Sequence, residues 1–230
     1  MALTNYIKAS LQEMFDYLKN PQEDIQISYQ PKSIARSYTA AITTLIAISM
    51  VLLITAITLR VCCPNIIHKH LVSDVSKAPW WIVTILGPIV EELFTRLALV
   101  RKNAFMACSL TIACFYVISC CAFTGKFYTM DFIWARIGVS ILAGGALFLV
   151  CRKWLTKCNY RAYFYTLAFL FAIGHITRVN FGTLLPFDYL MMMLYLAKQF
   201  GMGITFGYVR MKNGIVSSIL LHILNNAICF

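Results

Sequence analysis

Six polar residues in otherwise apolar stretches are of the types that carry out hydrolysis. They are Glu91, Glu92, Arg96, His175, His222 and Asn226. A buried carboxylate can act as the base that takes a proton from water. Imidazole and amide N–H groups can hold the oxyanion of a tetrahedral intermediate. Gathered at one site, these side chains would supply the parts that hydrolysis needs.

The spacing of these residues indicates which of them can cooperate. Glu92 and Arg96 are four residues apart, so on an α-helix they share a face and can form an ion pair. Glu91 is turned about 100° from Glu92 and, with no arginine four residues further on, can point elsewhere. His222 and Asn226 also share a helical face. Two simpler interpretations remain: one internal salt-bridge cluster of the three charged residues, and histidines that are only interhelical hydrogen-bond partners.

The same side chains could instead bind a metal, because a carboxylate and two imidazoles are a known zinc ligand set. If a divalent metal such as zinc is present, we expect its ligands to be Glu91, His175 and His222. The spacing from His222 to Asn226 does not match the HExxH zinc motif. A site without a cofactor is therefore the favoured expectation.

The chain that carries these residues is too apolar for a soluble domain. Of its 230 residues, 60% are hydrophobic and 13% are charged, and its mean hydropathy is +0.73. Soluble domains are nearer half apolar and a quarter charged. We therefore predict an all-α, polytopic membrane bundle. The net charge of +11 does not indicate nucleic acid as a partner, because the basic residues are scattered through short connections.

Apolar stretches long enough to cross the hydrocarbon core predict about seven transmembrane helices. They are residues 39–59, 80–100, 104–123, 131–151, 161–177, 189–209 and 214–230. With the N-terminus in the cytoplasm, most basic residues of the connections fall on the cytoplasmic side, which favours that orientation. We expect a multi-pass protein of the cytoplasmic membrane in a bacterium, or of the endoplasmic reticulum in a eukaryote.

The chain divides into an N-terminal segment, residues 1–38, and a transmembrane bundle, residues 39–230. In the first segment apolar residues recur at three- and four-residue spacing: Leu3, Ile7, Leu11, Met14 and Leu18. That pattern predicts an amphipathic helix, at the membrane interface or packed on the bundle.

In an untilted drawing of the bundle, His175 lies nearer the opposite membrane face than Glu91 and His222, so tilt or a longer helix must bring them level.

Three short motifs occur in order, each on a predicted span: EExxxR at Glu91 to Arg96, FxxxH at Phe171 to His175, and HxxxN at His222 to Asn226. In this order and placement they resemble the CPBP family, which comprises the type II CaaX prenyl endopeptidases and the bacteriocin-processing or immunity (Abi) proteins. The resemblance spans about residues 80–230 and implies a protease core there.

The resemblance implies an intramembrane endopeptidase, dependent on glutamate or, as long assumed for the family, on metal. Its substrate would be a prenylated CaaX tail, a leader or pheromone peptide, or a membrane-protein segment. The implied roles are activation of water by Glu91, support by Glu92 and Arg96, water positioning or proton transfer by His175, and oxyanion stabilisation by His222 and Asn226.

Two other functions fit the same residues. Intramembrane Glu, His and Arg also mark ion pathways, so a transporter or proton relay is one alternative, although the sequence has no inverted repeat of broken helices. A non-catalytic scaffold or immunity protein would keep the architecture without the chemistry. A relay should tolerate changes at Asn226, and a scaffold should tolerate Glu91→Gln.

Overall fold

The computed structural model describes residues 2–23, 27–62, 78–123, 126–178 and 186–229, and within these ranges it contains helices and no strand. The predicted all-α class is confirmed. Its α-helices are α1 (Ala2–Lys19), α2 (Pro31–Cys62), α3 (Gly87–Thr95), α4 (Asn103–Ile118), α5 (Ile133–Lys157), α6 (Tyr160–Gly174), α7 (Pro186–Asn213) and α8 (Ile215–Cys229). Shorter π- or 3-10-helical segments are η2 (Ile82–Leu86), η3 (Leu97–Leu99), η4 (Ser119–Phe123) and η5 (His175–Arg178).

Three of the described helical stretches are long and apolar enough to cross a membrane by themselves: Pro31–Leu59, Asn103–Phe123 and Ile133–Lys157. The outward surfaces of α2 and α5 carry large exposed apolar side chains, among them Ile46, Val51, Ile54, Trp134, Leu142 and Val150. Such surfaces suit lipid and would be unfavourable in water. The protein is accordingly an integral membrane protein, whereas a count of seven crossings stays a prediction.

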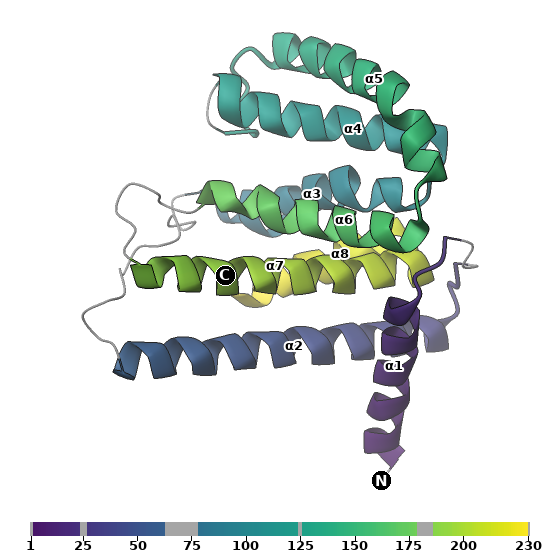
Figure 1. The fold of residues 1–230 in the computed structure, drawn as a ribbon, viewed down its shortest axis with the longest axis vertical. Coiled ribbons are helices and arrows are strands. Elements are labelled where there is room, and N and C mark those ends of the chain that lie inside the picture. Colours follow the sequence, from purple (N-terminus) through teal and green to yellow (C-terminus); the bar gives the residue numbers. More distant parts are fainter. Residues whose placement is uncertain (1, 24–26, 63–77, 124–125, 179–185, 230) are drawn as a thin grey trace.

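The helices lie side by side with α7 near the centre, in contact with α2, α6 and α8 (Figure 1). Buried apolar side chains fill the space between them, including Leu45, Phe164, Met202, Phe206 and Leu221. A Cβ at Gly203 would lie 2.9 Å from the Ala168 carbonyl oxygen, so α6 and α7 approach closely only because residue 203 is glycine. This close packing fixes the two helices that flank the polar residues.

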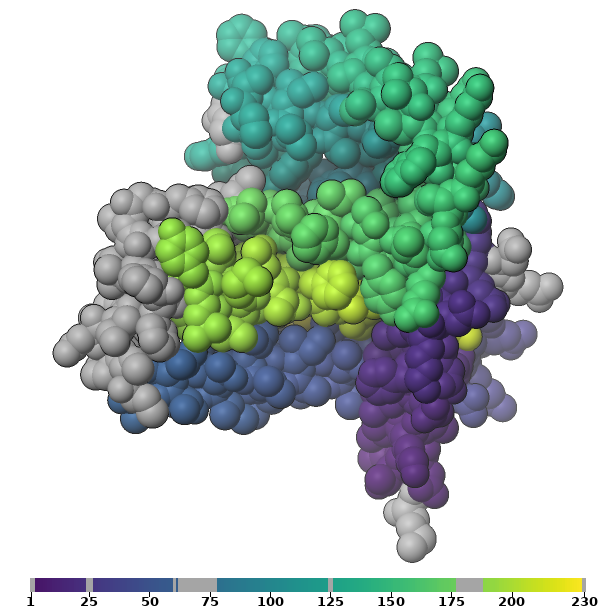
Figure 2. All heavy atoms as spheres, viewed as in Figure 1, coloured from purple at the N-terminus to yellow at the C-terminus, as the bar shows by residue number. Residues whose placement is uncertain are grey.

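Helices α4 and α5 form a hairpin that stands as a separate layer beside α3 and α6 (Figures 1 and 2). At Gly144 on α5, an added Cβ would lie 2.5 Å from the Thr111 Cα on α4. The two helices of the hairpin are therefore in tight contact, while the hairpin meets the rest of the bundle mainly through α4 against α3 and η3.

Helix α1 runs across the ends of the other helices and projects beyond them (Figure 2). Its buried side chains Met14 and Tyr17 pack on the bundle, whereas Leu3 and Phe15 are exposed. An ion pair of 2.9 Å joins Glu13 to Lys212 at the end of α7. The predicted amphipathic helix is confirmed, and its second half packs on the bundle.

The span predicted at residues 80–100 is not one continuous α-helix. It consists of the π-helical η2, the short α3 and the 3-10 segment η3. At the junction the Gly87 N–H donates to the Ile82 carbonyl oxygen, which an added Cβ would approach to 3.0 Å. Gly87 is followed by Pro88, whose fixed φ suits the first turn of a helix. Wide π turns often occur at functional sites, and this one sets where α3 presents its glutamates.

Candidate active site

Glu92 and Arg96 form the predicted ion pair across one turn of α3. The Arg96 Nε lies 3.8 Å from Glu92 Oε1, and both side chains are at most 2% exposed. The guanidinium also lies 4.1 Å from the Phe171 ring centroid on α6 and donates to the Gly203 carbonyl oxygen at 3.3 Å. A desolvated cation over an aromatic face is well stabilised. Arg96 therefore ties α3 to both α6 and α7.

The second and third partners of Glu92 come from α8. His222 Nδ1 lies 3.0 Å from Glu92 Oε1, and the Ser218 hydroxyl donates to Glu92 Oε2. Sequence reasoning missed Ser218, although it lies four residues before His222 and so shares its helical face. Glu92 is held by three groups from two helices, which fixes its position.

Removing the Ser218 hydroxyl tests how much this network stabilises the fold. Hydrogen bonds to charged groups contribute about 1.5 to 3 kcal/mol, so Ser218→Ala is expected to lower the thermal unfolding midpoint of the purified protein measurably. Ser217→Ala is the matched control, because among the described residues the Ser217 hydroxyl donates to the local Asn213 carbonyl oxygen and to no side chain. Equal midpoints for the two variants would contradict a special contribution of Ser218.

Glu91 faces two imidazoles, those of His175 and of His222, whose other ring nitrogen contacts Glu92. Its Oε2 lies 3.8 Å from His175 Nε2 and 3.7 Å from His222 Nε2. All three side chains are less than a tenth exposed. The structure thus places the Nε2 atoms of His175 and His222 within 4 Å of Glu91 Oε2. The charged residues are therefore not confined to a cluster of Glu91, Glu92 and Arg96.

The other ring nitrogen of each histidine fixes its tautomer. His175 Nδ1 lies 2.9 Å from the Phe171 carbonyl oxygen, which can only accept, so Nδ1 carries the proton. His222 Nδ1 faces the Glu92 carboxylate in the same way. In the neutral rings, both Nε2 atoms therefore present a lone pair toward Glu91. They are placed to exchange protons with a molecule held between them and that carboxylate.

A small cavity adjoins Glu91 and His175. Its volume is about 10 Å³ as the space open to the centre of a water molecule, and its walls are Glu91, Phe94, Tyr116, Phe171, Gly174 and His175. A space of that size holds about one water. The carboxylate and one imidazole thus share a compartment that suits a single water molecule.

Asn226 lies one turn beyond His222 on α8, and its contacts are with the segment before α3. Its Nδ2 donates to the Val83 carbonyl oxygen of η2 at 3.0 Å, and its Oδ1 accepts from Asn225 at 3.3 Å. The structure shows no contact of Asn226 with Glu91 or either histidine in the described residues. Its predicted role as an oxyanion donor stays a prediction.

His175 is level with the other two residues, as the motif interpretation required. Helix α6 ends at Gly174, and His175 begins the 3-10 segment η5. Its ring packs edge-on against Phe171, with centroids 4.8 Å apart, and is anchored by the Phe171 carbonyl oxygen. The F-x-x-x-H spacing therefore lets one residue both orient the histidine and support Arg96.

The residues do not form a ready metal site. In the part of the chain that the structure describes, no three His, Cys, Asp or Glu side chains converge closely enough to hold a metal ion. The donor set of Glu91 and two imidazoles is chemically suitable for zinc, and the expectation of a site without a metal stays a prediction. We derive no step through a metal.

The chain matches the model of one known protein family. The family model described as Rce1-like, Type II CAAX prenyl endopeptidase Rce1-like, matches residues 75–228, which is more than half of the chain. No curated protein and no solved structure matches the chain.

Proposed function

The chain belongs to the Rce1-like family of type II CAAX prenyl endopeptidases, and from this we propose that it cleaves a peptide bond within the membrane with water activated by Glu91. The family is a protease family, which supports proteolysis of a membrane-associated peptide. The observation that carries the proposal is the placement of Glu91 Oε2 opposite both His175 Nε2 and His222 Nε2. Beside them lies a cavity that suits one water.

In the proposed reaction Glu91 takes a proton from water as the water oxygen attacks the carbonyl carbon of the scissile bond. The oxyanion of the tetrahedral intermediate is stabilised by Asn226 and by His222 in its protonated form, in which Nε2 also carries a hydrogen, and His175 positions the water. Glu91 then gives the proton to the leaving amine as the C–N bond breaks. One water is consumed, and one carboxylate and one amine are formed.

The two glutamates would have different tasks. The carboxylate of Glu92 contacts Arg96, His222 and Ser218. Its charge therefore stabilises the contact between α3 and α8. Glu91 faces the water-sized cavity. Adjacent carboxylates with separate surroundings can therefore serve as a support and a base.

The substrate class best supported by the family is a prenylated CaaX tail. A leader or pheromone peptide and a membrane-protein segment are the other substrates to be distinguished. We also propose that the protein is multi-pass with a cytoplasmic N-terminus, because the basic connections then lie on the cytoplasmic side.

A comparison of peptide termini in native membranes tests the proposed function without a guess about the substrate. Membrane proteins from cells with and without this protein would be compared for their N- and C-terminal peptides. Termini that require the protein would support proteolysis and show whether the cut is CaaX-like. Identical termini under several growth conditions would contradict it and favour a relay or scaffold.

Chelation tests whether the site needs a metal. Because the described residues do not converge as metal ligands, peptide cleavage by the purified protein is expected to persist after dialysis against EDTA and 1,10-phenanthroline. Cleavage would be measured before and after treatment, and again after zinc is added back. Loss of activity that zinc restores would contradict glutamate-only chemistry.

A further inference from the structure

A second, larger cavity lies between the α4–α5 hairpin and helices α3 and α6. Its volume is about 380 Å³, and most of its walls are apolar, with Met106, Leu110 and Val117 on one side and Leu167 and Leu170 on the other. We call it the apolar chamber. It follows α4 and η4 from residue 106 to residue 121, which is about 22 Å at the rise of a helix.

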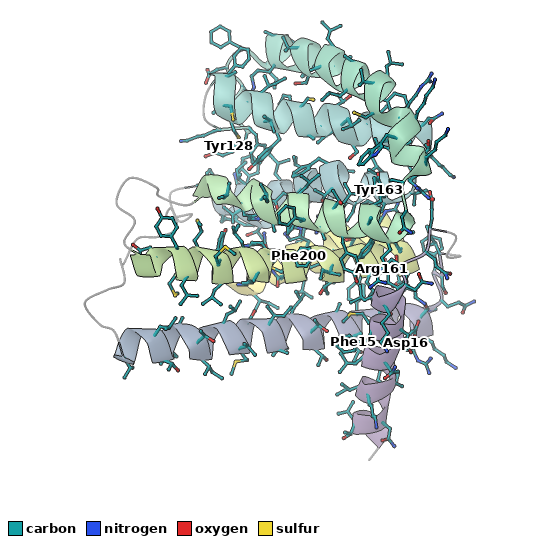
Figure 3. All side chains as sticks on the ribbon, viewed as in Figure 1. Phe15, Asp16, Tyr128, Arg161, Tyr163 and Phe200 are labelled. Carbon is teal, nitrogen blue, oxygen red and sulfur yellow. The ribbon has the colours of Figure 1, made fainter. Side chains whose placement is uncertain are left out.

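Three hydroxyl groups in the wall of the apolar chamber donate to carbonyl oxygens of the protein. Thr95 donates to the Glu91 carbonyl oxygen at 2.6 Å, and Ser109 donates to that of Phe94 at 2.5 Å. Tyr163 on α6, labelled in Figure 3, donates to the Ala98 carbonyl oxygen at 2.9 Å. A peptide backbone lying there would lose its hydrogen bonds to water and gain few in return. A hydrocarbon chain has no such requirement.

The apolar chamber adjoins the water-sized cavity at Glu91. Phe94, Tyr116 and Gly174 belong to the walls of both. The Phe94 and Tyr116 rings are stacked with centroids 5.6 Å apart, and they form one side of the boundary. On the other side, a Cβ added to Gly174 would meet no heavy atom of the described residues within 4 Å. The boundary is therefore open beside Gly174.

We propose that the apolar chamber holds the hydrocarbon chain of the substrate, and that the space beside Gly174 is where the attached peptide reaches Glu91. This inference rests on the proposed function. The chain lies along α4 while the scissile bond enters the polar compartment of Glu91 and His175. Gly174 is then a specificity-determining position, because any side chain there would fill the opening.

Substitution of Gly174 by a larger residue tests this opening. Gly174 is the last residue of α6, and larger residues have a higher helix propensity than glycine. Gly174→Leu is expected to lower kcat/KM for a farnesylated CaaX peptide by at least tenfold, and Gly174→Ala by less. The matched control is Gly138→Leu on α5, where an added Cβ also meets nothing within 4 Å. The control should cleave at the wild-type rate.

Cross-linking tests the chamber separately from catalysis. A farnesylated CaaX peptide with a diazirine on its isoprenoid would be irradiated with the full chain in lipid nanodiscs, and the labelled residues would be mapped. Labels on α4 and α6, retained in Gly174→Leu while cleavage is lost, would support the inference. Labels in the groove between α2 and α8, which Leu45 and Leu221 line, would overturn it.

The two proposals fail in different ways. If wild type cleaves neither farnesylated nor unmodified peptides but the label lies in the apolar chamber, the proposed function fails and the binding site stands. If wild type cleaves and Gly174→Leu cleaves equally well, the peptide does not reach Glu91 through the space beside Gly174. The proposed endopeptidase function is then still supported. Equal labelling by a diazirine peptide that lacks the isoprenoid would show that the chamber does not select a hydrocarbon chain, and would overturn the inference.

Discussion

Replacing Glu91 by Gln is expected to lower the rate of peptide hydrolysis by about 10² to 10⁴-fold, the usual contribution of a general base. The amide has nearly the same shape but cannot accept the proton of the attacking water. Because Glu91 faces His175 and His222 across 3.8 and 3.7 Å, an uncharged side chain should fit there without loss of packing. The purified variant would be compared with wild type for cleavage rate and for thermal unfolding midpoint.

Glu13→Gln is the control for this experiment. It makes the same chemical change in the ion pair with Lys212, at the end of the bundle where α1 packs. Glu13→Gln should retain cleavage, whereas Glu91→Gln should lose it while remaining folded. Full cleavage by Glu91→Gln would contradict the assignment of Glu91 as the base, because an amide cannot take the proton of the attacking water.

Replacing Arg96 by Met is expected to destabilise the protein by about 3 to 5 kcal/mol, which is the usual effect of leaving one member of a buried ion pair uncompensated. Glu92 would keep His222 and Ser218 as partners but lose its neighbouring cation. The contact of the guanidinium with Phe171 and its bond to Gly203 would also be lost. Denaturant unfolding in mild detergent would measure the difference.

A double variant separates charge from packing. Glu92→Gln combined with Arg96→Met removes both charges, so it should be more stable than Arg96→Met alone if the unpaired carboxylate is the cause. Lys19→Met serves as a surface control, since Lys19 pairs with Asp16 where both side chains are more than half exposed. A double variant no more stable than Arg96→Met would show that the lost contacts of the guanidinium dominate.

The sequence was most informative where local spacing decides geometry. The four-residue spacing of Glu92 and Arg96 predicted an ion pair, and the structure contains it at 3.8 Å. The apolar runs predicted helices at the right places, because a helix that crosses the hydrocarbon core needs about 20 mostly apolar residues in succession. The motif order also led to the family that the family model supports. The assignment of catalytic roles stays a prediction.

Local spacing could not show how the predicted span at residues 80–100 is divided or which residues meet across helices. The division lies at the wide turn before Gly87. Within that turn the Val83 carbonyl oxygen accepts from Asn226, a residue far away in the sequence. Ser218 escaped notice because a serine near a histidine is common and only its contact with Glu92 distinguishes it.

By itself the sequence determined an apolar helical protein, its helix positions and the polar residues that its membrane segments must accommodate. These follow from composition and from the 3.6-residue period, which are properties of short stretches. Only the tertiary structure decided that Glu91 faces His175 and His222 while Glu92 is committed to Arg96. It alone placed the apolar chamber next to Glu91. Helix packing sets those relations. Adjacent residues on one helix point in directions about 100° apart, so the packing of the other helices decides which side chains Glu91 and Glu92 each contact.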